Sequence, residues 1–273
     1  MATSEPVPNG EFMFRRDGIG DYAVVFVHGF LDDQHVWNSI VEKLTVSDFE
    51  TVQFDLPGFG ERTDATGPYT FERFAADLSA VVDAVNKPFV LVGHSMAAPA
   101  VELVAASRPD RVMGVVLLSP IPMGGVSLPE GMIEQVASIG ELGAAEHEAA
   151  RLQLAPAAPI DEVRRLAQVA AKARPEVVRV VADLWINGHP RGARQSEFSG
   201  PLLLLPGAND QLVNPEVLAS GVVRRFGAET TVTEIEGAGH WPHLERAAAV
   251  AREIDRFLAV AAAAREVSAT SGS

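Results

Sequence analysis

Short strand-like runs, most of them apolar, alternate along the chain with longer segments in which apolar residues recur every three or four positions. A run without polar alternation is typical of a strand that is buried on both faces of a sheet. Such runs lie at 23–27, 88–92, 112–119 and 201–207; the segments 50–54 and 231–235 are further predicted strands, and EFMFRR at 11–16 alternates like one more. Strands that alternate with helices at this spacing predict an α/β fold with a doubly wound, mostly parallel sheet.

The segments between the strands predict helices at 35–44, directly after 88–92, at about 215–226 and at 245–262. The clearest helix follows Thr70, which can cap its first turn. Its apolar residues keep the 3.6-residue period: Phe71, Phe74, Leu78, Val81, Val82 and Val85. One face of this helix is therefore expected to pack on the sheet.

The strand-like pattern stops after residue 119 and resumes at residue 201. Helical segments separated by Pro and Gly lie between, at 129–141, 144–154 and 160–185. A helical stretch inserted into a strand–helix alternation predicts a cap over the sheet. We expect residues 1–119 and 201–273 to form the core and 120–200 to form the helical cap.

Composition narrows the classes of partner. The 273 residues, 47% of them hydrophobic, suffice for one domain with an insertion. A formal charge of −14 without a basic run argues against nucleic acid or an anionic membrane as partner. There is no cysteine, and the polar start MATSEPVPNGEF lacks the basic and apolar regions of a signal peptide. We expect a cytoplasmic protein, and oligomeric state is not indicated.

Residues 88–106 carry the candidate chemistry, because an apolar strand runs through Gly93-His94-Ser95-Met96-Ala97 straight into a helix. Small residues two positions either side of Ser95 permit the very tight turn of a nucleophile elbow. In that turn the serine hydroxyl stands exposed above the end of the strand. Pro99 fits a helix that begins near Met96, since the first turn needs no amide hydrogen there.

A serine nucleophile requires a base and an acid that orients the base. Ligands of such sheets bind beyond the carboxyl ends of the strands. Asp210 follows the strand at 201–207, and His240 follows the strand at 231–235. The order Ser95, Asp210, His240 is the one expected with this elbow. His243 is an alternative base, although its place after the strand is less favourable.

These motifs resemble those of α/β-hydrolase-fold serine hydrolases, in the group of esterases, lactonases and peroxidase-like proteins with a helical cap. The resemblance spans residues 12–262 and includes His28-Gly29-Phe30 and Asp55-x-x-Gly58-x-Gly60. It implies that the backbone N–H groups of Phe30 and Met96 form an oxyanion hole and that His28 supports that loop. Ala97 departs from the commoner glycine of the family.

Serine at the elbow disfavours the aspartate chemistry of related dehalogenases and epoxide hydrolases and favours hydrolysis of an ester or lactone. Leu31, Ile121, Met123, Trp185 and Trp241 are the candidates to bind a small hydrophobic substrate of this kind. Two alternatives use the same fold: a cofactor-free oxygenase or perhydrolase, and a ligand sensor with little turnover.

We expect no cofactor and no metal. Gly18-Ile19-Gly20 resembles part of a dinucleotide fingerprint but precedes a strand instead of a helix. His240 and His243 have no third ligand at a suitable spacing. Asp32 and Asp33 are expected to be solvated or to bond within their loop, and His147 is expected at the surface.

Overall fold

The computed structural model describes residues 2–226 and 229–271. An eight-stranded sheet lies at the centre of the fold that they form. The strand order is β1-β2-β4-β3-β5-β6-β7-β8. The first two strands pair antiparallel and the pairs among the other six are parallel, which confirms the predicted fold class. The strands are β1 (Thr3–Pro6), β2 (Met13–Asp17), β3 (Tyr22–Val27), β4 (Phe49–Phe54), β5 (Phe89–His94), β6 (Val112–Leu118), β7 (Leu202–Leu205) and β8 (Thr230–Val232).

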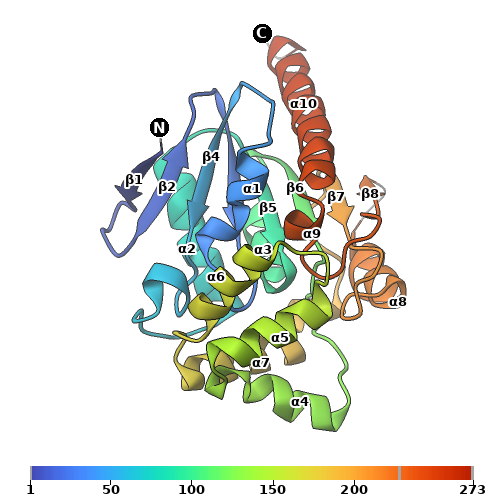
Figure 1. The fold of residues 1–273 in the computed structure, drawn as a ribbon. Helices are drawn as coiled ribbons and strands as arrows, with labels where there is room; N and C mark the ends of the chain where they lie inside the picture. Colours follow the sequence, from blue (N-terminus) through green and yellow to red (C-terminus); the bar gives the residue numbers. More distant parts are fainter. Residues whose placement is uncertain (1, 227–228, 272–273) are drawn as a thin grey trace.

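Helices cover both faces of the sheet, and β3 shows why its strands are apolar throughout. Alternate side chains of a strand point to opposite faces. Ala23, Val25 and Val27 therefore join the core beneath α2 and α3, while Val24 and Phe26 join the core that includes α1 and α10 (Figure 1). These helices are α1 (Asn38–Val41), α2 (Phe71–Val85), α3 (Ala98–Ser107) and α10 (Ala247–Ser271).

Helix α2 begins at the cap that its sequence predicts. The Thr70 hydroxyl accepts a hydrogen bond of 3.2 Å from the Arg73 N–H, which satisfies a free donor of the first turn. At the other end Asn86 takes a left-handed conformation, with φ of 54°, and stops the helix. The predicted apolar face is buried along its whole length.

Four α-helices lie between β6 and β7, where the helical cap was predicted: α4 (Glu130–Ala137), α5 (Ala144–Leu154), α6 (Ile160–Ala170) and α7 (Pro175–Asn187). Figure 1 shows α4, α5 and α7 together at one end of the sheet, opposite the end from which α10 projects. The domain boundaries at 120 and 200 stay a prediction.

The prediction of one helix over 160–185 is wrong, because α6 ends at Ala170 and α7 starts at Pro175. Proline disfavours the helical conformation in the residue before it. Arg174 accordingly has an extended backbone, with φ of −69° and ψ of 127°. The break separates two helices that make different contacts with the core.

Smaller differences concern the segments after β7. The helix expected at 215–226 is a chain of short turns, and α9 precedes α10, which extends past the predicted end at 262. The short elements are η1 (Gln34–Trp37), η2 (Gly60–Arg62), η3 (Ser95–Ala97), η4 (Ile139–Glu141), η5 (Pro190–Ala193), α8 (Pro215–Val217), η6 (Leu218–Val222), η7 (Val223–Arg225) and α9 (Pro242–Glu245). Among the described helices, none combines the length and the apolar character needed to cross a bilayer.

Candidate active site

Ser95 stands at the carboxyl end of the central strand β5 in the tight turn that its neighbours predict. Its φ is 51°, a left-handed conformation that costs roughly 1–3 kcal/mol for a residue other than glycine. A Cβ atom on Gly93 would lie 2.9 Å from the Cγ2 atom of Val101, so the turn needs a residue without a side chain there. Pro99 lies in the first turn of α3, where its missing N–H costs nothing.

Ser95, His240 and Asp210 form one hydrogen-bonded chain, although up to 145 residues separate them in sequence. The His240 Nδ1 atom lies 2.8 Å from Asp210 Oδ2, and its Nε2 atom lies 2.9 Å from Ser95 Oγ. A carboxylate can only accept, so Nδ1 carries the proton and donates to Asp210. Nε2 is then free to accept the Ser95 hydroxyl proton, which is the arrangement a general base requires.

Asp210 is kept ionised by its partners. Burial alone raises the pKa of this carboxyl group, but the charge and hydrogen bond of His240 and the Val213 N–H outweigh burial. The net pKa of Asp210 is therefore held below its ordinary value. Its Oδ1 atom accepts from the N–H groups of Leu212 and Val213, both at 2.9 Å, which fixes the carboxylate in the loop after β7.

The segment that carries His240 is held by helix α5. The His240 N–H donates to the carbonyl oxygen of Leu154, the last residue of α5, at 2.9 Å. A Cβ atom on Gly239 would lie 2.1 Å from that same oxygen, so only glycine allows the approach. The His240 carbonyl lies 2.8 Å from His94 Nε2, which must donate because a carbonyl cannot.

Phe30 and Met96, the predicted oxyanion donors, lie in the loop after β3 and in η3 directly after Ser95, and Phe30 lines the same cavity as Ser95. Met96 lies in the first turn of η3, where backbone N–H groups lack partners within the helix. Phe30 precedes Leu31, whose φ of 58° bends the chain after β3. His28 supports this loop: its Nδ1 donates to the Gly29 carbonyl at 2.8 Å and its Nε2 accepts from the Leu56 N–H at 2.9 Å. The role of Phe30 and Met96 stays a prediction.

A cavity of about 360 Å³ opens onto Ser95 and His240. Four of the five predicted substrate-binding residues line it, namely Leu31, Ile121, Trp185 and Trp241. Met123 is not among the described residues that line the cavity; it is buried, and its carbonyl accepts from the His189 N–H at 2.7 Å. The other lining residues are Phe30, His94, Leu128, Met132, Gln135, Val136, Ile139, Leu142, His147, Ala150, Arg151, Gln153, Leu154 and Leu212.

Most of the lining residues that sequence reasoning missed come from α4 and α5. Their helical spacing was visible, but periodicity does not tell which face of a cap helix points inward. The expectation that His147 lies at the surface is wrong, since the side chain is 4% exposed and lines the cavity. Burial, followed by the charge of Arg151, lowers its pKa and favours the neutral ring.

The arrangement of elbow, acid and base has a counterpart among known families. A model of the alpha/beta hydrolase family matches residues 24–253, which include Ser95, Asp210 and His240. The chain belongs to the alpha/beta hydrolase family. The resemblance predicted from the motifs is thereby confirmed.

This alpha/beta hydrolase is similar to esterases and lactonases. It is 27% identical over 262 residues to strigolactone esterase RMS3 of Pisum sativum, and the matched region covers 89% of this chain and 95% of that protein. The bromoperoxidase from Bacillus anthracis matches with a TM-score of 0.80 and 19% identity, over 94% of this chain and 99% of that chain. The enol-lactonase from Burkholderia xenovorans LB400 gives a TM-score of 0.77 and 20% identity, over 94% and 100%. At these identities the two structures show the fold.

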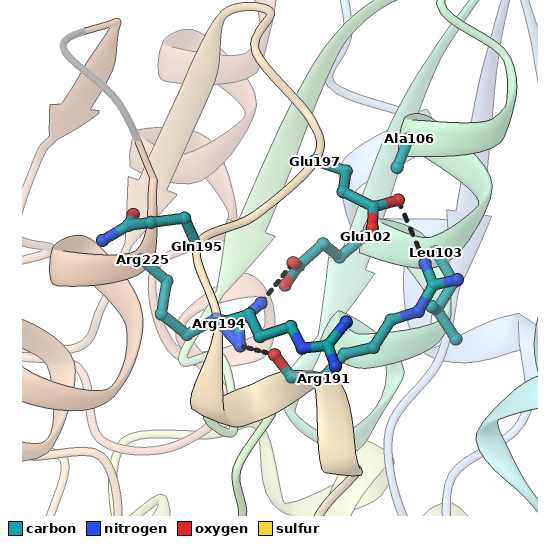
Figure 2. A pocket seen from close by; sticks show the side chains of 8 residues that line it. All are labelled: Glu102, Leu103, Ala106, Arg191, Arg194, Gln195, Glu197 and Arg225. Atoms are coloured by element: carbon teal, nitrogen blue, oxygen red, sulfur yellow. Dashed lines mark hydrogen bonds and ion pairs between the residues drawn. The ribbon is translucent and has the colours of Figure 1, made fainter.

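A second hollow of the alpha/beta hydrolase lies away from Ser95 and is lined by charged residues (Figure 2). Its volume of about 10 Å³ holds at most one water molecule. Most of its charges are already paired, since Arg225 lies 2.6 Å from Glu102 and Arg191 lies 3.3 Å from Glu197. We do not assign a substrate site to this hollow.

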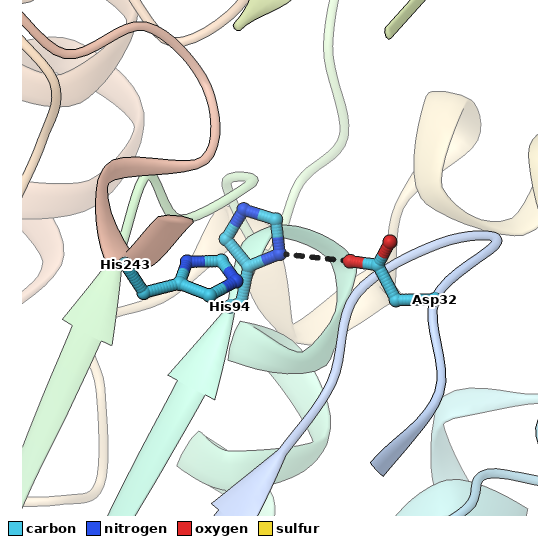
Figure 3. A group of neighbouring side chains, drawn as sticks. All are labelled: Asp32, His94 and His243. Carbon is cyan, nitrogen blue, oxygen red and sulfur yellow. Dashed lines mark ion pairs between the residues drawn. The ribbon is translucent and has the colours of Figure 1, made fainter. Parts of the chain in front are cut away.

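Asp32, His94 and His243 gather beside His240, and their ligand-type atoms lie within 4.8 Å of one another (Figure 3). Within the described residues neither ring nitrogen of His243 has a hydrogen-bond partner. Arg151 lies 2.8 Å from Asp32 and already neutralises its charge, so a divalent cation would add uncompensated positive charge to a buried site. These neighbours disfavour a metal, and the expected absence of one stays a prediction.

Proposed function

We propose that this alpha/beta hydrolase cleaves the ester or lactone bond of a small hydrophobic substrate, with Ser95 as nucleophile, His240 as base and Asp210 as orienting acid. The observation that carries the proposal is the hydrogen-bonded chain of these three side chains, which opens onto a cavity of about 360 Å³. The likeness to an esterase over nearly the whole chain supports the same class of reaction.

In the first half of the reaction the Ser95 oxygen attacks the substrate carbonyl carbon while its proton passes to His240 Nε2. Asp210, kept ionised, stabilises the imidazolium that forms. The N–H groups of Phe30 and Met96 donate to the negative oxygen of the tetrahedral intermediate. His240 then returns the proton to the leaving alcohol oxygen, the ester C–O bond breaks, and an acyl group remains on Ser95.

In the second half a water molecule attacks the acyl carbon and gives its proton to His240. The carboxylic acid leaves, and Ser95 regains its proton from His240. With a lactone, the alcohol released in the first half stays tethered to the acyl group. No cofactor enters either half. In this proposal residues 120–200 act as the cap that encloses the substrate, and residues 1–119 and 201–273 carry the three reacting groups.

The test is a panel of short aryl esters, lactones and amides, measured with the wild-type chain and with Ser95→Ala in parallel. We expect ester or lactone turnover in the wild type and a loss of at least about 10⁴-fold in kcat for Ser95→Ala, because the nucleophile is gone. Circular dichroism of both proteins checks that the fold persists. Equal turnover by the two proteins would contradict the proposal.

Labelling by a fluorophosphonate separates the proposal from the two alternatives. Rapid labelling of Ser95 with many turnovers per molecule supports hydrolysis. Labelling with a single turnover points to a ligand sensor instead. Activity that depends on peroxide or consumes oxygen, with feeble ester hydrolysis, points to perhydrolysis or oxygenation.

A further inference from the structure

Helix α5 reaches the loop after β3 through a buried ion pair. The Arg151 Nη1 atom donates to Asp32 Oδ1 at 2.8 Å, and its Nη2 atom donates to the Leu31 carbonyl at 3.1 Å. Arg151 is 5% exposed and Asp32 is fully buried. The fork of one guanidinium therefore binds two consecutive residues of the core loop at once.

Asp32 continues this contact toward the base. Its Oδ2 atom accepts a hydrogen bond of 2.9 Å from Trp241 Nε1 and lies 3.5 Å from His94 Nδ1. Trp241 follows His240 directly, and His94 donates to the His240 carbonyl. The Arg151 guanidinium also lies over the Trp241 ring, 4.4 Å from its centre. The hydrogen bond from Trp241 thus ties the Asp32 carboxylate to the segment that carries His240, while His94 contacts that segment through Nε2 and its Nδ1 has no hydrogen-bond partner within the described residues.

The other end of the contact lies beside the predicted oxyanion donor. Leu31 has a φ of 58°, which a residue with a side chain adopts only when its surroundings hold it there. The Arg151 fork binds the carbonyl of this residue, one position after Phe30. Loss of the fork would free the bend that aims the Phe30 N–H at the substrate oxygen.

A buried ion pair is weak evidence of a stabilising role, because the cost of removing two charges from water offsets their attraction. Substrate binding is a poor second explanation, since the charge of Arg151 is already taken up by Asp32. What sets this pair apart is its place, because it joins α5 to both loops that present groups to Ser95.

We propose that Arg151 and Asp32 are positioning residues, which hold the Phe30 loop and the His240 segment in register with Ser95 while α5 is docked. The inference rests on the proposed function. Arg151 touches neither the attacking oxygen nor the proton that moves, and acts through the loops that it holds.

The chain offers a matched control at Asp33, the residue after Asp32, which also pairs with an arginine. Arg165 of α6 donates to Asp33 through Nη1 at 2.6 Å and through Nη2 at 3.0 Å. This pair joins the same cap to the same core loop, but within the described residues the Arg165 guanidinium bonds to Asp33 and Glu162 and to neither Leu31 nor Trp241. A role in docking the cap alone would make the two arginines equivalent.

The test compares Arg151→Met with Arg165→Met in the full chain, with a short aryl ester that the wild type hydrolyses. For Arg151→Met we expect kcat to fall by roughly 10²-fold with KM within about threefold of wild type, because a shift of about 1 Å misaligns the reacting groups. The rate of fluorophosphonate labelling falls in parallel. For Arg165→Met we expect kcat and KM within about threefold of wild type.

Arg151→Lys keeps the proposal testable if Arg151→Met does not fold. A lysine retains the positive charge beside Asp32 but lacks the planar fork that serves Asp32 and the Leu31 carbonyl together. We expect kcat to fall about tenfold while the melting temperature stays near that of wild type. Equal losses in Arg151→Met and Arg165→Met, or a full-rate Arg151→Lys, would overturn the inference. Failure of the proposed function would appear separately, as an ester turnover that Ser95→Ala retains.

Discussion

Helices α4 and α5 both line the cavity above Ser95, but they differ in how much of each helix is buried against the rest of the molecule. All of α4 belongs to the described residues, and none of its side chains is buried. It packs against α7 and contributes side chains such as Met132 to the cavity. Helix α5 instead buries His147 and Arg151, and its last carbonyl binds the His240 N–H.

Under the proposed function, this difference assigns the selection of a substrate to α4 and the assembly of the active site to α5. A helix with few buried contacts opens at low free-energy cost and tolerates substitution, so α4 can adapt to the molecule that enters. In the proposed mechanism, a helix bound to the Phe30 loop and to the His240 segment cannot move without disturbing the chemistry. We therefore expect substitutions in α4 to change which ester is cleaved, and substitutions around α5 to change how fast any ester is cleaved.

The largest effect is expected outside both helices, at Asp210. Asp210→Asn should lower kcat by roughly 10⁴-fold, because an amide can donate to His240 Nδ1 and hold the ring in the tautomer that cannot accept a proton. Kinetics on a short aryl ester measure the loss, with circular dichroism as the check of folding. A loss below tenfold would mean that another residue orients His240. The effects of α4 and α5 variants on kcat could then not be interpreted through this triad.

The attachment of α5 should depend on pH. Burial raises the pKa of Asp32, but the positive charge of Arg151, the neighbouring His94 and the Trp241 N–H outweigh burial and hold the pKa well below its ordinary value. A depressed pKa in the folded state stabilises it above the unfolded value of about 3.9, and this contribution is lost as the pH falls through the folded value. Asp32→Asn should therefore cost about 3–5 kcal/mol of unfolding free energy at pH 7.

Urea unfolding from pH 7 down to pH 3 tests this dependence. The difference between wild type and Asp32→Asn should be constant down to about pH 5 and shrink below about pH 4. Glu134→Gln in α4 is the control, since Glu134 makes an exposed pair of 3.5 Å with Arg179. It should change stability by less than about 0.5 kcal/mol at every pH. A constant cost of Asp32→Asn down to pH 3 would contradict the assigned charge of Asp32.

Two glycines sharpen the comparison further. Gly239→Ala would place a methyl group against the Leu154 carbonyl, so the backbone contact between α5 and His240 must open. We expect kcat to fall about 10²-fold. Gly131→Ala in α4 meets no described atom within 4 Å and should stabilise the chain by about 0.5–1 kcal/mol through helix propensity, with kcat unchanged. Steady-state kinetics measure kcat, and thermal melts measure stability, for both variants. An equal kcat in the two variants would contradict the proposed difference between α4 and α5.

The smallest effect is expected from Met132→Ala. Met132 lines the cavity and is 45% exposed, so its loss removes part of an apolar wall and leaves the catalytic groups in place. KM for esters with long acyl chains should rise roughly threefold, and kcat for a short ester should stay unchanged. Ile133→Ala is the matched control, because Ile133 is 39% exposed and is not among the described residues that line the cavity. A fall in kcat for Met132→Ala would show that α4 also positions the reacting groups.

Much of the scaffold around Ser95 could be predicted because local and periodic patterns dictate it. Apolar runs mark strands buried on both faces, and small residues around Ser95 permit one tight turn. The break before Pro175 was missed although the sequence carries a signal for it, since proline disfavours a helical conformation in the residue before it. The failures at His147 of α5 and at Met123 in the turn after β6 have another cause: whether a side chain faces the cavity depends on how its segment packs on the rest of the molecule, which no local pattern encodes.

The sequence by itself predicted the parallel sheet, the tight turn at Ser95 and the places of Asp210 and His240 after later strands. Each depends on residues that are neighbours along the chain or on the general rule that strand ends meet at one edge. Only the tertiary structure brought Arg151 of α5 to Asp32 of the loop after β3, across 119 residues. Two buried charges pair only once the helix that carries one packs against the loop that carries the other. The spacing of the two residues in the sequence does not show that they will meet.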